Sequence, residues 1–167
     1  GVELPVGSIG EIVAHTAAIM TGYHNHPELT AEAEWRDAAG RRYFRTGDIG
    51  RLDEEGFLTL LDRKKDMIIS GGFKVYPSDL EEVLRGHDAV LDAAVAGAPS
   101  ERWGETPVAF VLLKSAATAT AETLLAWANA RLGKTQRLAE VRLVDELPRN
   151  PLGKVLKREL RERLRQG

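Results

Sequence analysis

Short apolar or alternating segments, separated by turn residues, make up the first third of the chain. Residues 10–14 (GEIVA) predict a strand, and residues 43–52 and 56–63 predict two more, joined by a turn at residues 53–56. The charged run Asp-Arg-Lys-Lys-Asp at residues 62–66 then interrupts the pattern. Because it holds no apolar residue and separates apolar strands, we expect it to be a linker that lies outside any core.

The pattern changes after this linker. Two short apolar runs flank the pair Gly71-Gly72, which predicts a tight β-hairpin. Residues 76–86 predict a short helix that is capped by Ser78 and ends at Gly86. Strands are predicted at residues 89–99, 106–114 and 139–147, an amphipathic helix at 120–132 and a closing basic helix at 154–166. The order ββαββαβα predicts an α+β domain with helices packed on a small sheet.

Composition narrows the class of protein. The 167 residues are 43% hydrophobic and 29% charged, as in a soluble globular protein with one ordinary or two small domains. No apolar run is long enough to span a bilayer, and no signal-peptide pattern is present at the start. The absence of cysteine excludes a disulfide framework and fits a reducing cytoplasm, so we expect a cytoplasmic location. The chain does not begin with methionine, and we expect it to be a piece of a longer polypeptide.

Charge and histidine content exclude further classes. The net charge is −2 and the pI about 6.1, so we expect no nucleic-acid partner. Residues 149–167 hold seven Lys or Arg and two Glu, which makes this end +5 and the remainder −7. Such a basic end is either a solvated face or a site for an anionic partner. The four histidines show no metal-ligand grouping.

Several residues have the chemistry of a ligand site, each with an ordinary alternative. Asp48 follows Thr-Gly at a strand edge, where a carboxylate holds a sugar diol or simply caps a turn. Arg63 suits a ribose or a phosphate, or else a surface ion pair with a neighbouring aspartate of the linker. Gly71 and Gly72 let a ligand approach the backbone closely, or only form the hairpin. Trp103 lies in a charged loop, where it stacks on a base or a pantetheine chain, or covers the core.

Lys154 follows the turn residues Asn-Pro-Leu-Gly and precedes the basic helix. Proline fixes φ and glycine frees it, so residues 150–153 predict a tight exposed turn. Taken alone, Lys154 is one more solvated charge.

The motifs taken together are more specific than any one of them alone. In order and spacing, G-E-I, then R-T-G-D, then D-R-K-K-D-x-I-I-S-G-G-F-K-V-Y-P-x-D-L-E, then P-R-N-x-x-G-K-V resembles the adenylate-forming superfamily. This superfamily comprises acyl- and aryl-CoA synthetases, adenylation domains of peptide synthetases, and luciferases. The resemblance covers residues 10–164, and the long D-R-K-K-D block is its most specific part.

The resemblance implies a domain organisation. The family has a large N-terminal domain and a small, mobile C-terminal domain that rotates between two half-reactions. Residues 1–62 would then be the last strands of the large domain, residues 63–66 the hinge, and residues 67–167 the C-terminal α+β lid domain, a short sheet flanked by helices. The phosphate-gripping loop and the acyl pocket would lie upstream.

The resemblance also implies roles for individual residues. Asp48 matches the aspartate that holds the ATP ribose hydroxyls, and Arg63 matches an arginine that contacts the same nucleotide. Lys65 takes the hinge position. Gly71 and Gly72 match the loop that enters the active site for thioester formation.

Lys154 matches the lysine that bridges the substrate carboxylate and the α-phosphate during adenylation. A loop tip would let it reach a site on another domain and then leave. Residues 135–138 replace the aromatic-Lys-x-Pro found in many CoA ligases, so among them Arg137 is our candidate for the CoA nucleotide, together with Trp103 near the thioester loop. The stretch before R-T-G-D is also longer and more polar than the family pattern.

The implied activity is that of an ATP-dependent acyl-CoA synthetase acting on a fatty or aromatic acid, inactive as an isolated fragment. Its implied partners are a carboxylic acid, ATP, CoA and the protein's own N-terminal domain, with Mg²⁺ ligands upstream. Two alternatives are an adenylation domain that loads a carrier protein and a non-catalytic binding module.

Overall fold

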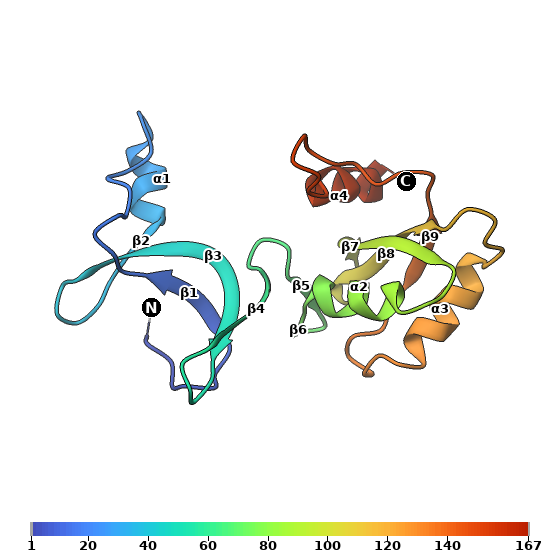
Figure 1. Ribbon diagram of the computed structural model, residues 1–167, viewed down its shortest axis with the longest axis horizontal. Helices are drawn as coiled ribbons and strands as arrows, with labels where there is room; N and C mark the ends of the chain where they lie inside the picture. Colours follow the sequence, from blue (N-terminus) through green and yellow to red (C-terminus); the bar gives the residue numbers. More distant parts are fainter. Residues whose placement is uncertain (1, 167) are drawn as a thin grey trace. The chain divides into compact units, whose positions relative to one another are not determined.

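The computed structural model describes residues 2–166 and divides into two compact units (Figure 1). The first unit ends at Lys65 and the second begins at Asp66. This break falls inside the segment that was predicted to be a hinge. Among the described residues, no helix is long and apolar enough to cross a membrane.

The first unit is built on one long strand. β3 (Arg42–Leu52) pairs antiparallel with β1 (Gly10–Ala14), β2 (Glu34–Arg36) and β4 (Leu58–Arg63). The three strands predicted from the sequence are confirmed. A short helix, α1 (Pro27–Glu32), and strand β2 were not predicted.

The long polar stretch before the R-T-G-D motif forms a hairpin. One carboxylate oxygen of Asp37 accepts the N–H groups of Ala39 and Arg41 at 2.9 and 2.8 Å, and Gly40 has φ +77°. These contacts close the turn between β2 and β3, which explains how a polar segment belongs to a sheet.

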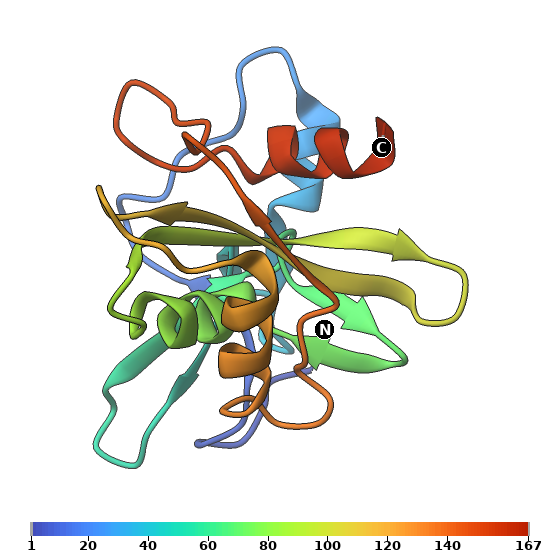
Figure 2. The ribbon, with the colours of Figure 1, turned by 90° about the vertical axis from the view of Figure 1, so that its right-hand side faces the viewer.

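The second unit has the predicted order of elements and is α+β. Its strands are β5 (Ile68–Ser70), β6 (Phe73–Val75), β7 (Val90–Ser100), β8 (Gly104–Leu113) and β9 (Glu140–Leu143). Its helices are α2 (Pro77–Arg85), α3 (Ala121–Asn129) and α4 (Lys157–Gln166). β8 lies at the centre, antiparallel to β5 and β7 and parallel to β9. Figure 2 shows α2 and α3 on one face of this sheet and α4 on the other.

Alternation along β7 explains the two faces. Ala93 and Val95 pack in the core beneath α2 and α3, whereas Ala94 and Ala96 pack in the core beneath α4. Successive side chains of a strand point to opposite faces, so an apolar run such as this one is buried on both sides. The small residues at these positions leave room for the helices.

The start of α2 differs from the prediction. The helix begins at Pro77 with Tyr76 as its N-cap in an extended conformation, so Ser78 lies inside the first turn and is not the cap. The fixed φ of proline is already suited to the first helical position, which accounts for this start. At α3 a capping box of Thr120 and Thr123 starts the helix, and the sequence analysis did not identify it.

The expectation that the whole charged linker lies outside a core is wrong at its last residue. Asp66 is buried and forms an ion pair with Arg161 of α4. Burial of a carboxylate is tolerated because the guanidinium of Arg161 pairs with it. Asp66 therefore anchors the beginning of the second unit to its last helix.

Candidate functional site

Asp48 and Arg63 face each other across β3 and β4. They are register partners, and Nε of Arg63 lies 2.8 Å from Oδ1 of Asp48. An ion pair with an aspartate of the linker was the ordinary alternative for Arg63, but the ion pair forms with Asp48. Both side chains are partly exposed, so their remaining oxygen and N–H groups are available to a ligand.

The backbone around Asp48 is fixed by its neighbours. The hydroxyl of Thr46 donates to the carbonyl of Ile12 at 2.9 Å and accepts the N–H of Asp48 at 3.0 Å. Gly47 has φ +72°, a conformation that side chains disfavour, and its carbonyl accepts the N–H of Lys64 at 2.8 Å. The Thr-Gly-Asp motif is thus a hydrogen-bonded irregularity within β3 that fixes the backbone carrying the Asp48 carboxylate.

Lys65 lies between two anchored neighbours. Nζ of Lys64 lies 2.9 Å from Oε2 of Glu11 in the first unit, while Asp66 pairs with Arg161 in the second. Lys65 itself is exposed in the turn between β4 and β5. The backbone of Lys65 therefore lies between a residue held by the first unit and a residue held by the second.

Gly71 and Gly72 form the turn of the β5–β6 hairpin. Their φ angles are +57° and +84°, as a two-residue turn with two left-handed positions requires. The N–H of Gly71 donates to the carbonyl of Trp103 at 2.8 Å. The hairpin turn and the Trp103 loop are therefore joined.

Trp103 does not cover the core, which was the ordinary alternative for it. Its side chain is partly exposed, and the guanidinium of Arg102 lies 4.5 Å from the ring centroid. The indole lies against Gly71, because a Cβ added at that glycine would be 2.8 Å from Cε3 of Trp103. The structure thus brings Gly71 and Trp103 together as a two-glycine turn beside an exposed aromatic face.

Lys154 follows a turn closed by Asn150. The side-chain oxygen of Asn150 accepts the backbone N–H groups of Leu152 at 3.1 Å and Lys154 at 2.8 Å. The backbone N–H of Asn150 donates to the carbonyl of Lys154 at 2.9 Å. Gly153 has φ +81°. The Lys154 side chain is exposed, and within residues 2–166 no ion pair engages its ammonium. The lysine is thus available, while its backbone is held.

Arg137 lies exposed in the loop between α3 and β9. Over the described part of the chain, no hydrogen bond or ion pair joins it to the other candidate residues. Its neighbour Gln136 donates to Oδ2 of Asp79 on α2 at 3.3 Å. The structure therefore places Arg137 beside the α2–α3 side of the second unit.

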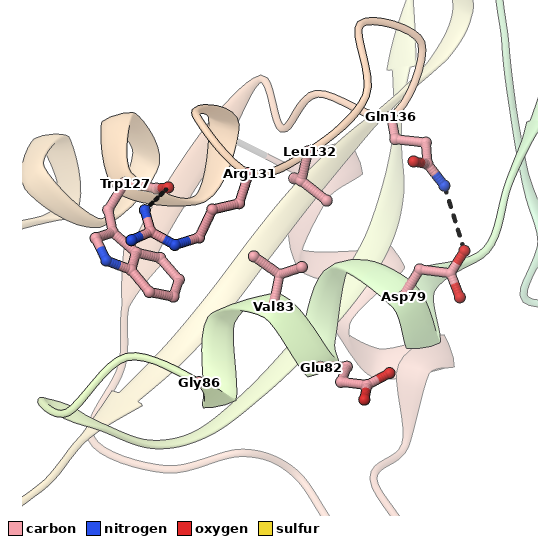
Figure 3. Close-up of a pocket in the computed structure, with 8 residues that line it drawn as sticks. All are labelled: Asp79, Glu82, Val83, Gly86, Trp127, Arg131, Leu132 and Gln136. Atoms are coloured by element: carbon pink, nitrogen blue, oxygen red, sulfur yellow. Dashed lines mark hydrogen bonds between the residues drawn. The ribbon is translucent and has the colours of Figure 1, made fainter.

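An open hollow of about 640 Å³ lies on that side, between α2 and α3 (Figure 3). Asp79 and Glu82 line it, and Arg131 lies along the ring of Trp127, 3.9 Å from its centroid. Two carboxylates in its wall make it a poor site for a phosphate group. No sequence pattern signals this hollow, because its walls come from two helices that are far apart in the chain.

Over residues 2–166 there is no group of three or more His, Asp or Glu side chains that could hold a metal ion.

Residues 79–154 match the family model described as the AMP-binding enzyme C-terminal domain. These residues belong to that family. The match ends at Lys154, so this lysine and the turn closed by Asn150 are part of it. The resemblance to adenylate-forming enzymes that the motifs indicated is confirmed.

Relatives extend the similarity over nearly the whole chain. A 2-succinylbenzoate–CoA ligase from Geobacillus kaustophilus is 47% identical over 152 residues, which are 91% of this chain and 30% of that protein. ATP-bound MatB from Rhodopseudomonas palustris matches with a TM-score of 0.89 at 37% identity, over 98% of this chain and 32% of that one. Apo MatB matches with a TM-score of 0.65 at the same identity and coverage.

A third relative was solved with a reaction intermediate. The o-succinylbenzoate CoA synthetase from Bacillus subtilis, in complex with its acyl-adenylate, matches with a TM-score of 0.81 at 36% identity, over 94% of this chain and 31% of that one. The chain thus spans about a third of the length of the relatives it matches.

Proposed function

We propose that this AMP-binding C-terminal domain, with the strands before it, is the C-terminal part of an ATP-dependent acyl-CoA synthetase. A carboxylate would attack the α-phosphate of ATP to give an acyl-adenylate and pyrophosphate. The thiol of CoA would then attack the acyl carbon to give an acyl-CoA and AMP. The observation that carries the proposal is Lys154, an exposed cation after a turn closed by Asn150, at the end of the family match.

Lys154 would act in the first half-reaction. Two anionic groups must meet there, and a cation between them offsets their repulsion and stabilises the charge of the transition state. Its exposure after the turn supports this role, because an exposed ammonium is open to contact with a substrate.

Asp48 and Arg63 would hold the nucleotide. The carboxylate of Asp48 has oxygens that accept hydrogen bonds from a ribose diol, and the ion pair keeps Arg63 beside it with further N–H donors. The hydrogen-bonded Thr-Gly-Asp segment of β3 supports the proposal, since ribose recognition needs a fixed acceptor.

The Gly71–Gly72 turn and Trp103 would serve the second half-reaction. Two glycines leave the backbone open to the pantetheine chain of CoA, and the exposed indole offers it an apolar face. Arg137 would contact the CoA nucleotide from the loop before β9.

The exchange between half-reactions would be a rotation of the second unit about Lys65. Its two neighbours are anchored to different units, which leaves its backbone to absorb the change in φ and ψ.

The acid is proposed to be aromatic rather than a fatty acid. The 2-succinylbenzoate ligases among the relatives favour an aryl acid. The partners would be the N-terminal domain of the same protein, ATP and CoA, and the location cytoplasmic. Any Mg²⁺ would be bound by residues outside this chain.

The test uses the full-length protein that contains this segment. Pyrophosphate exchange is measured with ATP and a panel of aromatic and fatty acids, and acyl-CoA is then identified by mass spectrometry after CoA is added. We expect exchange with an aromatic acid and a CoA thioester as product. The isolated chain should give background exchange. Failure of every acid, or transfer of the acyl group only to a carrier protein, would contradict the proposal.

A further inference from the structure

The turn that carries Lys154 is tied to the second unit at both of its ends. Before the turn, Arg149 forms an ion pair with Asp92 of β7. After it, Nζ of Lys157 lies 2.8 Å from Oε1 of Glu81 on α2. Each tether joins the turn to an element more than fifty residues away in the sequence.

Arg85 of α2 joins the two tethers. Its Nε lies 2.9 Å from Oδ1 of Asp92, and its NH2 group lies 3.4 Å from Oε2 of Glu81. The charged residues therefore form a continuous chain from one end of the turn to the other. We call this set the Lys154 brace: Arg149, Asp92, Arg85, Glu81 and Lys157.

The brace also caps the open edge of β7. Among the described strands β7 pairs only with β8, so its other edge has free backbone groups. Oε1 of Glu81 accepts the N–H of Val95 at 2.9 Å, and Arg85 donates to the carbonyl of Ala93 at 2.8 Å. These bonds fix the brace to the sheet itself, so it does not move independently of the core.

The inner part of the brace is shielded from water. The side chains of Glu81 and Lys157 are 10% and 14% exposed, and that of Asp92 is 21% exposed. Burial alone would raise the pKa of Asp92, but hydrogen bonds from Arg85 and the Ala93 N–H, with the charges of Arg85 and Arg149, hold that pKa below its ordinary value. Ion pairs shielded in this way are screened less by salt than surface pairs are.

Arg149 connects the brace to the turn directly. One terminal nitrogen of its guanidinium pairs with Asp92, and the other donates to the carbonyl of Gly153, the residue before Lys154. A planar guanidinium makes two such bonds in a fixed geometry, which a lysine cannot reproduce. Arg149 thus links the backbone next to Lys154 to strand β7.

We infer that Arg149, held by Asp92, is a positioning residue for Lys154. The inference rests on the proposed function of Lys154. Without the brace, the turn would keep its internal bonds to Asn150 but would lose its fixed direction. The Lys154 side chain would then have to be brought into position at each turnover. This would slow adenylation although no residue that contacts the substrate is changed.

The test compares four variants of the full-length protein. Arg149→Met removes the guanidinium and its charge. Asp92→Asn weakens the ion pair with Arg149 and changes the shape of the side chain little. Arg149→Lys keeps the positive charge but cannot make the two guanidinium bonds. Arg158→Met is the matched control, because Arg158 is 83% exposed on α4 and its pair with Glu162 lies outside the brace. Adenylation is measured by pyrophosphate exchange, and thioester formation is measured from supplied acyl-adenylate.

We expect Arg149→Met and Asp92→Asn to slow adenylation about 10- to 100-fold. Arg149→Lys should recover little of this loss, and thioester formation should stay within about twofold. In a Lys154→Ala background, Arg149→Met should not slow adenylation further, because the effects of two residues are not additive when one acts through the other. Equal losses in both half-reactions, or full additivity, would overturn the inference and leave the brace a purely structural feature.

A second measurement needs no activity. Amide hydrogen exchange of Gly153 and Lys154 in the present chain should become faster in Arg149→Met and remain unchanged in Arg158→Met. If wild-type protein forms no adenylate with any acid, the proposed function fails, whereas this measurement still decides whether Arg149 holds the turn. Unchanged exchange in Arg149→Met would overturn the inference.

Discussion

Trp103 lies so close to Gly71 that a Cβ on the glycine would be 2.8 Å from Cε3 of the indole. The contact joins the hairpin turn to the loop before β8, next to the backbone bond between the same residues. Both glycines of the turn have positive φ, but nothing lies within 4 Å of a Cβ built on Gly72. The two positions therefore differ in the room available for a Cβ, whereas both have a positive φ.

This difference predicts unequal costs of substitution. Gly72→Ala should lower the free energy of unfolding by about 1 to 2 kcal/mol through backbone strain alone. Gly71→Ala should cost roughly 1 kcal/mol more, because the indole must also move. Chemical denaturation of the chain, followed by circular dichroism, measures both.

A double variant isolates the contact with Trp103. Truncation by Trp103→Ala should remove the extra cost of Gly71→Ala and leave the cost of Gly72→Ala unchanged. If Gly71→Ala and Gly72→Ala are equally destabilising, Trp103 does not restrict the turn.

The elements of the second unit were predictable because each has a local signal. The apolar run of β7, the glycine pair of the hairpin and the glycine after α2 all lie within a few residues of the feature they specify. The cap of α2 was mistaken because Ser78 has the right side chain, while Pro77 before it sets the start.

Features that depend on distant partners could not be predicted. Asp66 looked like a linker residue, and only the approach of Arg161 from α4 explains its burial. Likewise, Asp92 and Arg149 each look like ordinary surface charges until the fold brings them together. The candidate residues themselves were found through motifs, whereas the contacts that hold them are long-range.

The first unit should lose stability in acid through Glu11. Burial alone would raise the pKa of Glu11, but hydrogen bonds from Arg45 and Lys64 outweigh it and hold the pKa below its ordinary value of 4.5. A lowered pKa in the folded state stabilises the fold above 4.5, and the contribution is lost as the pH falls through the folded pKa.

Glu11→Gln should therefore destabilise the first unit by about 1 kcal/mol at neutral pH. The difference from wild type should shrink as the pH falls below 4.5, because protons then bind the unfolded carboxylate, and it should vanish once the pH is below the lowered pKa of the folded state. Urea denaturation between pH 3 and 7 measures this, with Glu55→Gln in the exposed β3–β4 turn as the control. A difference that is constant over this range would exclude the ion pairs as its cause.

Lys65→Pro tests the hinge in the full-length protein. Proline fixes its own φ and restricts the residue before it, so the backbone between the anchored Lys64 and Asp66 could no longer turn. We expect thioester formation to fall much more than adenylation, or both to stop if the rotation is frozen. Lys65→Ala is the control and should retain both rates. Wild-type rates for Lys65→Pro would show that the hinge lies elsewhere.

The role of Lys154 predicts a loss confined to one half-reaction. Lys154→Ala should slow acyl-adenylate formation by about 10²–10³-fold, the usual effect of removing one preorganised group that stabilises transition-state charge. Thioester formation from supplied acyl-adenylate should change little, since no new charge is placed between carboxylate and phosphate in that step. Acetylation of Lys154 should act like the alanine substitution, because it removes the charge.

Folding should hardly respond to Lys154→Ala, because the side chain is exposed and the turn is held by Asn150 and the Lys154 brace. Single-turnover assays of the two half-reactions, run separately, measure the kinetic effect, and thermal melting measures stability. Lys157→Ala is the informative comparison, since Lys157 is a partly buried member of the brace and its loss should lower the melting temperature. If Lys154→Ala slowed both half-reactions equally or lowered the melting temperature as Lys157→Ala does, Lys154 would be a structural cation and not a catalytic one.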